Sequence, residues 1–278
     1  MTRRYDLHTH SRLSDGILAP AELVAHAHTR QVDVLALTDH DVTDGLAEAA
    51  AAAAACGLTF VPGVEISVTW GNQTVHIIGL RVDATAPDLQ HGLARLRATR
   101  LERAREIDRR LQKKGITGAL EGAQALCHGA TLSRTHFARF LIQTGHAPDL
   151  RRAFRQFLSH GAPAYVPVQW AGLEQAVAWI RGAGGQAALA HPARYKLSPG
   201  KLRSLIGEFK DCGGAALEVI SGTHSAEENR RFAALALRFD LRASVGSDYH
   251  GPEKPWVEVG RLPPLPAGCV PVWQDWKE

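Results

Sequence analysis

The sequence predicts an α/β fold, a barrel of about seven strands that a helical insertion interrupts. Apolar strand-like runs alternate with helical segments in the first 86 residues and again from residue 166, as in parallel βαβ units. Between these parts, residues 87–165 are polar and helical, without a convincing strand pattern. The length of 278 residues suits one large domain with an insertion. We therefore expect 1–86 and 166–278 to build one barrel with a C-terminal tail, and 87–165 to form a helical cap.

The composition is that of an ordinary globular protein, with 45% hydrophobic and 22% charged residues. No apolar run approaches the roughly 20 residues that a membrane helix needs. The charged start of the chain does not resemble a secretory signal. The four cysteines are isolated and show no CxxC spacing, which favours a reducing compartment. We expect a cytoplasmic protein with no membrane association and no evident protein partner.

Each element in the first half of the barrel has a local signal. A short apolar strand at the start leads to two histidines, and a proline opens the helix that follows. Gly57 ends the second helix at a C-cap position. Residues 65–83 alternate apolar and polar types around Gly71-Asn72, as in an antiparallel hairpin. We predict helices over 20–31 and 43–56, and strands over 32–38 and 58–65.

Regular alternation of helices and apolar strands resumes near residue 172. We predict helices over 172–183, 199–212 and 226–239, and strands over 186–192, 215–221 and 242–250. The insertion before them contains the strongly basic stretch Arg95–Lys114. This stretch is either a solvated helix face with intrahelical ion pairs or an electrostatic attractor for a polyanionic substrate.

Side chains that bind metal ions follow nearly every predicted strand. Strand residues two apart point the same way, so His8 and His10 form a ligand pair. In parallel barrels the active site forms at the carboxyl ends of the strands, where the other candidates would join this pair. The individual alternatives are a core histidine for His76, a helix cap for His40 and a turn residue for Asp15. The full set is His8, His10, Asp15, His40, Glu65, His76, His191, Asp248 and His250.

Nine ligands exceed the three or four that one zinc ion takes, which indicates a multinuclear centre with bridging carboxylates. Three carboxylates contribute about −3 and three divalent ions about +6, so the site would keep about +3, which suits a phosphate dianion. Mixed histidine and carboxylate ligands suit manganese, zinc or iron. We expect two to three divalent ions, with manganese as the first choice and zinc or iron as alternatives.

Six motifs carry these ligands, in the order DLHTHSRLSDG, LTDHD, PGVEIS, VHIIG, AHP and GSDYH. They resemble the motifs of the polymerase and histidinol phosphatase (PHP) family of metal-dependent phosphoesterases. The resemblance implies a distorted (β/α)7 barrel in which a hydroxide that bridges metal ions attacks phosphorus. It implies a catalytic core of His8, Glu65, His191 and Asp248. It assigns one ion to His8, His10, Glu65 and Asp248, a second to Glu65, His76 and His191, and a third to Asp15, His40 and His250.

One segment of the insertion bears on the substrate. Residues 131–141 (TLSRTHFARFL) resemble the SRxHxAR segment of a PHP subfamily that dephosphorylates 3′,5′-nucleoside bisphosphates. Arg134 and His136 stand where a helix begins, which is a natural anion site. Arg194 and His224 follow other strands at the same mouth and are further substrate-binding candidates. A structural role is the alternative for each, such as a surface ion pair for Arg134.

The leading prediction is a phosphatase that removes the 3′-phosphate of 3′,5′-nucleoside bisphosphates, converting pAp to AMP and phosphate. Trp170 and Tyr195 would stack on the base, or else pack in the core. The alternative activity is a 5′→3′ exoribonuclease on short 5′-phosphorylated RNA, which presents the same phosphorus and which Arg95–Lys114 favours. A metal-binding accessory module is disfavoured by the complete ligand set. A histidinol phosphatase has no evident need for Arg134 and His136.

Overall fold

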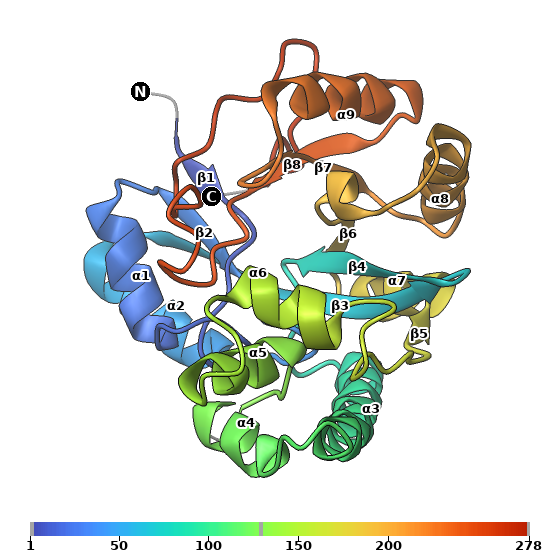
Figure 1. Ribbon diagram of the computed structural model, residues 1–278. Coiled ribbons are helices and arrows are strands. Elements are labelled where there is room, and N and C mark those ends of the chain that lie inside the picture. Colours follow the sequence, from blue (N-terminus) through green and yellow to red (C-terminus); the bar gives the residue numbers. More distant parts are fainter. Residues whose placement is uncertain (1–2, 128–129, 277–278) are drawn as a thin grey trace.

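Eight strands and the helices around them make up the described part of the chain, residues 3–127 and 130–276 of a computed structural model (Figure 1). The strands are β1 Tyr5–Asp6, β2 Val34–Leu37, β3 Thr59–Trp70, β4 Gln73–Leu80, β5 Ala171–Gly172, β6 Gln186–Leu189, β7 Ala216–Ser221 and β8 Arg242–Gly246. The helices are α1 Pro20–Thr29, α2 Leu46–Cys56, α3 Pro87–Gln112, α4 Ala119–Cys127, α5 Arg134–Gln143, α6 Leu150–Ala153, α7 Leu173–Gly182, α8 Pro199–Asp211 and α9 Ala226–Arg238. A π-helical turn spans Phe154–Leu158 and a 3-10 turn spans Pro192–Arg194.

Seven strands form the barrel wall in the order β1-β2-β3-β4-β6-β7-β8, and β5 pairs with β3 outside this path. The first and last strands meet where Leu7 N donates to Val245 O at 3.0 Å. Most neighbours are parallel, but β4 runs antiparallel to both β3 and β6. The start of β4 therefore lies at the rim where the parallel strands end. The predicted α/β barrel is confirmed, and the reversed strand accounts for its distortion.

The hairpin of β3 and β4 corrects one predicted strand end. The sequence predicts a strand over 58–65 and a separate hairpin over 65–83, but β3 runs through both regions as far as Trp70 and pairs with β4, with Ser67 opposite His76. Apolar residues of both strands pack into the core together with α7, so the extended conformation remains favourable beyond the rim. Gly71 has a φ of 55° in the turn, as the Gly-Asn signal predicts.

Two further elements differ from the sequence-based expectation. The two-residue strand β5 was not predicted, because so short a segment carries no periodic signal. β8 was expected to reach His250 but ends at Gly246. Beyond it, Asp248 adopts a φ of 56°, which turns the chain inward at the rim.

The helical insertion has a hydrophobic cluster separate from that of the barrel. α3 to α6 pack around residues such as Leu111, Phe137 and Leu141, whereas the barrel wall encloses Leu7 and Ile78. The described residues between 87 and 165 contain no strand, as the sequence predicts. The division of the chain at 86/87 and 165/166 stays a prediction. Among the described residues, no helix has the length and apolar character that a membrane span requires.

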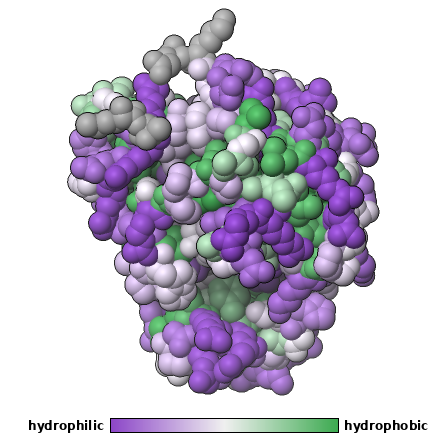
Figure 2. All heavy atoms as spheres, turned by 90° about the horizontal axis from the view of Figure 1, so that it is seen from above, coloured by the Kyte–Doolittle hydropathy of each residue, from purple (hydrophilic) through white to green (hydrophobic). Residues whose placement is uncertain are grey.

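The C-terminal tail closes the far end of the barrel. Val272 is buried among the apolar residues of the barrel interior, and the ring of Trp273 stacks on Tyr5 at 4.0 Å. Seen from above, hydrophilic residues cover most of the visible face of the molecule and apolar ones appear in patches between them (Figure 2). The rim with the predicted metal ligands lies at the other ends of the strands.

Candidate metal centre

The predicted metal ligands all lie at one rim of the barrel. His8 and His10 follow β1, Glu65 lies within β3, and His76 lies near the start of β4. The reversal of β4 is needed here, because in a parallel strand a residue near the start would lie at the opposite rim. The others follow strands or lie in the loops between them, at Asp15, His40, His191, Asp248 and His250.

The first ligand set joins residues from three strands or their ends. The Nε2 atoms of His8 and His10 lie 3.1 Å apart, and each is 3.3 Å from Glu65 Oε2. Asp248 Oδ1 lies 3.4 Å from the Nε2 of His8 and 3.2 Å from that of His10. All four residues are buried. The structure thus brings together the set that the family resemblance assigns to one ion.

The second set uses the other oxygen of Glu65. Glu65 Oε1 lies 3.0 Å from His76 Nδ1 and 2.9 Å from His191 Nε2. These two histidine nitrogens lie 3.4 Å apart. Because Oε2 faces the first set, Glu65 stands between the two sets with one oxygen for each. His40 Nδ1 lies 2.9 Å from Glu65 Oε2, the oxygen that faces the first set.

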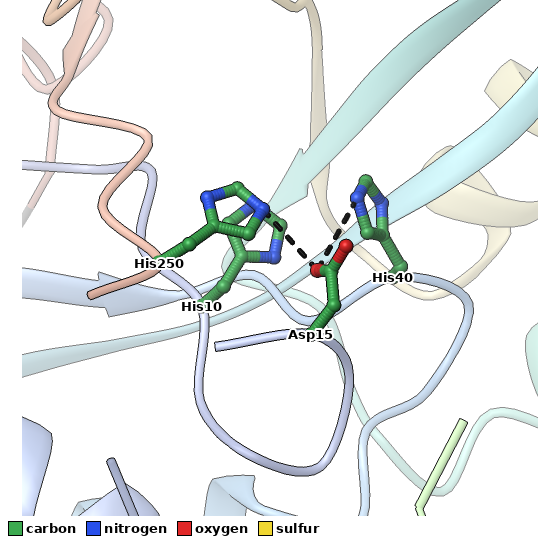
Figure 3. A group of neighbouring side chains, drawn as sticks. All are labelled: His10, Asp15, His40 and His250. Atoms are coloured by element: carbon green, nitrogen blue, oxygen red, sulfur yellow. Dashed lines mark ion pairs between the residues drawn. The ribbon is translucent and has the colours of Figure 1, made fainter. Parts of the chain in front are cut away.

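The third set gathers around Asp15 (Figure 3). Asp15 Oδ1 lies 3.2 Å from His250 Nε2 and 3.7 Å from His40 Nε2. The other oxygen, Oδ2, accepts hydrogen bonds from Ser133 Oγ at 3.2 Å and from Thr135 Oγ1 at 2.8 Å. Asp15 therefore connects the rim to the start of α5, in the helical insertion.

The donor atoms at the rim fit divalent cations. Among the described residues, Asp15 Oδ1, Glu65 Oε2 and Asp248 Oδ1 are buried carboxylate oxygens without a hydrogen-bond donor. A buried charged oxygen of this kind is costly unless a cation neutralises it. Burial disfavours charge on Glu65, yet the histidines around it hold its pKa well below the usual range. Divalent metal ions with mixed nitrogen and oxygen ligands satisfy these groups.

Two of the rim histidines, His8 and His10, show the same demand for positive charge, whereas burial lowers the pKa of His40 to about 4 and that of His191 to about 3. Burial opposes a charge on His10, but the nearby carboxylates of Asp248 and Glu65 raise its pKa to about 9. A metal ion that binds here replaces a proton, because imidazole must be neutral to act as a ligand. The rim therefore stabilises positive charge, either as a proton on a histidine or as a bound metal ion.

Comparison with known proteins identifies the family. Residues 6–165 match the PHP domain. The chain belongs to the PHP family. A 3′,5′-nucleoside bisphosphate phosphatase from Chromobacterium violaceum is 49% identical over 271 residues, which are 97% of this chain and 95% of that protein. The 5′-3′ exoribonuclease Rnm of Escherichia coli K12 is 45% identical over 276 residues, 99% of this chain and 94% of that protein.

A similar solved structure supports the assignment to this family and its fold. It is described as an amidohydrolase from Chromobacterium violaceum with bound sulfate and no metal. It matches this PHP chain with a TM-score of 0.93 and 49% identity, over 98% of this chain and 95% of the other. The family and the fold predicted from the six motifs are therefore confirmed.

Two of the predicted substrate-binding residues, Arg194 and His224, lie beside the PHP rim. Their side chains make different contacts. Arg194 forms an ion pair with Asp248, and its side chain is 32% exposed. Both ring nitrogens of His224 meet the backbone, with Nε2 3.4 Å from Ala193 N and Nδ1 3.3 Å from Val219 O. The contacts favour a loop-holding role for His224 and leave Arg194 accessible to an anion. Substrate contact by either residue stays a prediction.

Arg134 and His136 lie in the first turn of α5. The Arg134 guanidinium lies 5.8 Å from the ring centroid of Phe154, and Nη1 makes a long contact of 3.5 Å with Leu158 O. His136 is buried, and its Nδ1 accepts a hydrogen bond from Ser133 N at 3.0 Å. This bond caps α5, so the contacts favour an ordering role for His136. Binding of substrate by these residues also stays a prediction.

Two arginines that the sequence did not single out lie near Arg134. Arg100 and Arg103 point inward from α3 and lie 5.2 and 4.8 Å from the ring centroid of Trp170. Arg100 pairs with Asp41 at 2.6 Å. In the described ranges, neither Arg103 nor Arg134 forms an ion pair with a carboxylate. Burial and then the charges of Arg100 and Arg134 hold the pKa of Arg103 well below its usual range, which marks uncompensated positive charge.

The basic stretch Arg95–Lys114 has two different faces. On the outer face Arg109 and Arg110 pair with Glu106 at 2.6 and 2.7 Å, as the solvated-face alternative expects. The inner face carries the arginines near Trp170. A helix of 26 residues presents both faces, and the sequence alone did not show which arginines point inward.

The two aromatic candidates for base stacking have structural contacts. Trp170 is buried in the main core cluster beneath the inner arginines. The Tyr195 hydroxyl donates to Ala190 O at 2.8 Å and accepts from His76 N at 2.9 Å. Both sets of contacts favour the packing alternative.

Two buried acids behind the ligands were also missed. Glu218 Oε1 in β7 lies 2.9 Å from His8 Nδ1. Asp39 accepts hydrogen bonds from Ser11 N at 2.8 Å and Ser14 Oγ at 2.6 Å. Each has a weak signal in the sequence. Glu218 is an acid inside an otherwise apolar strand, and Asp39 directly precedes the predicted ligand His40. Neither signal separates a ligand from a residue that supports one.

Replacing Arg100 with leucine is expected to lower the free energy of unfolding by about 3–5 kcal/mol, because Asp41 would keep a buried charge without its partner. Urea denaturation followed by circular dichroism measures this loss. Arg109→Leu, on the outer face of the same helix, is the matched control and should leave the free energy of unfolding unchanged within error. Equal losses in both variants would contradict the importance of the buried pair.

Proposed function

We propose that this PHP enzyme hydrolyses the 3′-phosphate of 3′,5′-nucleoside bisphosphates such as pAp and releases the 5′-monophosphate and phosphate. The observation that carries the proposal is that two arginines near the proposed metal centre, Arg103 and Arg134, form no ion pair with a carboxylate among the described residues, so that they could bind a second phosphate. A substrate with one phosphate needs only the metal rim, whereas one with two phosphates fills both sites. The relative from Chromobacterium violaceum bears the name of this activity.

In this proposal the reacting phosphate lies at the metal rim and the 5′-phosphate lies against Arg103 and Arg134. Guanidinium groups suit a terminal phosphate because they donate paired hydrogen bonds to its oxygens. Arg194 offers a further guanidinium beside Asp248, where negative charge develops on the reacting group. When bound, two to three divalent ions, with manganese as first choice and zinc or iron as alternatives, supply Lewis-acid stabilisation of that charge.

The catalytic core in this proposal is His8, Glu65, His191 and Asp248. Glu65 would hold ions on both of its oxygens, and the other three would fix the positions of those ions. The remaining proposed ligands are His10, Asp15, His40, His76 and His250. His136 and His224 would act on substrate indirectly, by ordering the start of α5 and the loop after β7.

The second candidate activity is 5′→3′ exoribonucleolysis of short 5′-phosphorylated RNA. The relative from Escherichia coli, 45% identical, bears that name. A 3′-phosphodiester held by the same two sites presents the same phosphorus to the rim. The ion pairs on the outer face of α3 reduce the support that the basic stretch gives to this alternative.

Steady-state kinetics on pAp, adenosine 3′-monophosphate and a 5′-phosphorylated dinucleotide, each with manganese, test the proposal. We expect kcat/KM for pAp to exceed that for adenosine 3′-monophosphate by about 100-fold, because charge-assisted hydrogen bonds to a second phosphate contribute about 3 kcal/mol. If kcat/KM for the dinucleotide exceeded that for pAp by more than about tenfold (1.4 kcal/mol), the exoribonuclease activity would become the favoured function. Less than one bound ion per chain and no activity with manganese would favour an accessory module.

We also propose a cytoplasmic location. Cys56, Cys212 and Cys269 are free thiols, which suits a reducing compartment. Fractionation of the cells that produce the protein, followed by immunoblotting, tests this location.

A further inference from the structure

Glu218 is a buried carboxylate of the barrel wall that none of the roles above uses. It lies in β7, whose residues are all buried, and it is 0% exposed. A carboxylate in such a place is costly unless both oxygens find donors. Two donors are present, because Oε1 lies 2.9 Å from His8 Nδ1 and Oε2 accepts a hydrogen bond from the backbone N–H of His191.

The contact with Glu218 determines which nitrogen of His8 is available to a metal ion. A neutral His8 that donates from Nδ1 to this carboxylate keeps its lone pair on Nε2. Nε2 is the atom that faces Glu65 Oε2 at 3.3 Å and Asp248 Oδ1 at 3.4 Å. A carboxylate behind a metal-binding histidine fixes the ring and raises its basicity.

The second contact of Glu218 acts on His191. His191 has φ 25° and ψ 59°, a left-handed conformation that residues with a side chain rarely adopt. The hydrogen bond from its N–H to Glu218 holds this turn while Nε2 lies 2.9 Å from Glu65 Oε1. Glu218 therefore supports one histidine on each side of Glu65.

Glu218 and His8 pack directly against the backbone of Gly246. A Cβ at Gly246 would lie 2.2 Å from the Cβ of His8 and 2.7 Å from Glu218 Oε1. Glycine is needed there because only its backbone fits so close to both side chains. The contact is thus part of the packing between β7, β8 and the end of β1.

We propose that Glu218 is a positioning residue that orients His8 and His191 together and thereby sets the affinity of the rim for metal ions. The His8 ring lies between Glu218 and the first ligand set, so Glu218 itself contacts neither the ions nor the substrate. The inference rests on the proposed metal centre and is independent of the identity of the substrate.

The variant Glu218→Gln tests this role without a change in size. A glutamine offers one acceptor and one NH2 group to two donors, so either orientation of its amide loses a hydrogen bond. We expect the affinity for Mn²⁺, measured by isothermal titration calorimetry, to fall by about 10–100-fold. The circular dichroism spectrum of the metal-free variant should match that of the unmodified protein.

The matched control is Glu258→Gln, which removes the carboxylate from a different His–Glu pair, the 2.8 Å contact with His26 away from the rim. It should bind Mn²⁺ as the unmodified protein does. A folded Glu218→Gln variant whose affinity lies within about twofold of the control would overturn the proposal.

A measurement on the unmodified protein covers the case in which the variant does not fold. Nitrogen-15 NMR of the Zn²⁺-loaded protein with labelled histidine reports which nitrogen of His8 carries the proton. We expect the proton on Nδ1, and a proton on Nε2 would overturn the proposal. Unmodified protein that binds neither Mn²⁺ nor Zn²⁺ would instead refute the metal centre, on which the proposed function also depends.

Discussion

Replacing Glu65 with glutamine is expected to lower kcat/KM for pAp by about 1000-fold or more. Its two oxygens face different ligand sets, with Oε2 3.3 Å from His8 and Oε1 2.9 Å from His191. An amide supplies only one acceptor and no charge, so it holds an ion on one side at most. Mass spectrometry of the bound metal should therefore show a lower ion content per chain, in parallel with the loss of activity.

The control for this experiment is Glu102→Gln, because Glu102 is an exposed residue of α3 with the same side chain. It should keep both the ion content and the activity of the unmodified protein. A Glu65→Gln variant with full ion content and more than about a tenth of the activity would show that Glu65 does not bridge two ions.

Replacing Arg134 with alanine is expected to separate the two phosphate sites. We expect kcat/KM for pAp to fall by about 10–100-fold, because a guanidinium that donates a charge-assisted hydrogen bond to a phosphate contributes about 1.5–3 kcal/mol. For adenosine 3′-monophosphate, which lacks the 5′-phosphate, the change should stay below about threefold. Initial rates with both substrates at saturating manganese measure the difference.

The matched control is Arg139→Ala on the same helix, where the arginine pairs with Glu253 at 2.8 Å. This variant should leave unchanged the ratio of kcat/KM for pAp to kcat/KM for adenosine 3′-monophosphate. Equal losses on both substrates in Arg134→Ala would mean that the arginine supports the fold of the insertion instead of binding the second phosphate.

The positions of the proposed ligands at the rim were predictable because each lies in or just after a segment with a local strand or hairpin pattern. His8 and His10 occur two apart at the end of a strand, and Asp248 and His250 repeat that spacing. The rule that active sites form at the carboxyl ends of barrel strands then joins positions far apart in the sequence. His76 followed from the hairpin signal around Gly71, which reverses the strand that carries it.

The supporting residues were not predictable, because their roles depend on which way a side chain points. Arg103 and Arg109 look alike in a basic helix, yet one is buried near Trp170 and the other pairs with Glu106 at the surface. Glu218 has no local motif, and its role appears only when β7, β8 and the end of β1 are packed together. His136 stands at a helix start, as an anion ligand would, but its ring turns back to the backbone of its own cap.

The two oxygens of Asp15 have a thermodynamic consequence. One faces the histidines of the third ligand set, and the other accepts hydrogen bonds from Ser133 and Thr135 at the start of α5. Because one carboxylate serves both, an ion that orients Asp15 also stabilises the start of α5. Free energies of binding are reciprocal, so if a phosphate binds at Arg134 on α5 as proposed, it would tighten the binding of the ion by the same factor by which the ion tightens the binding of the phosphate. Substrate and metal would then bind as cooperative ligands.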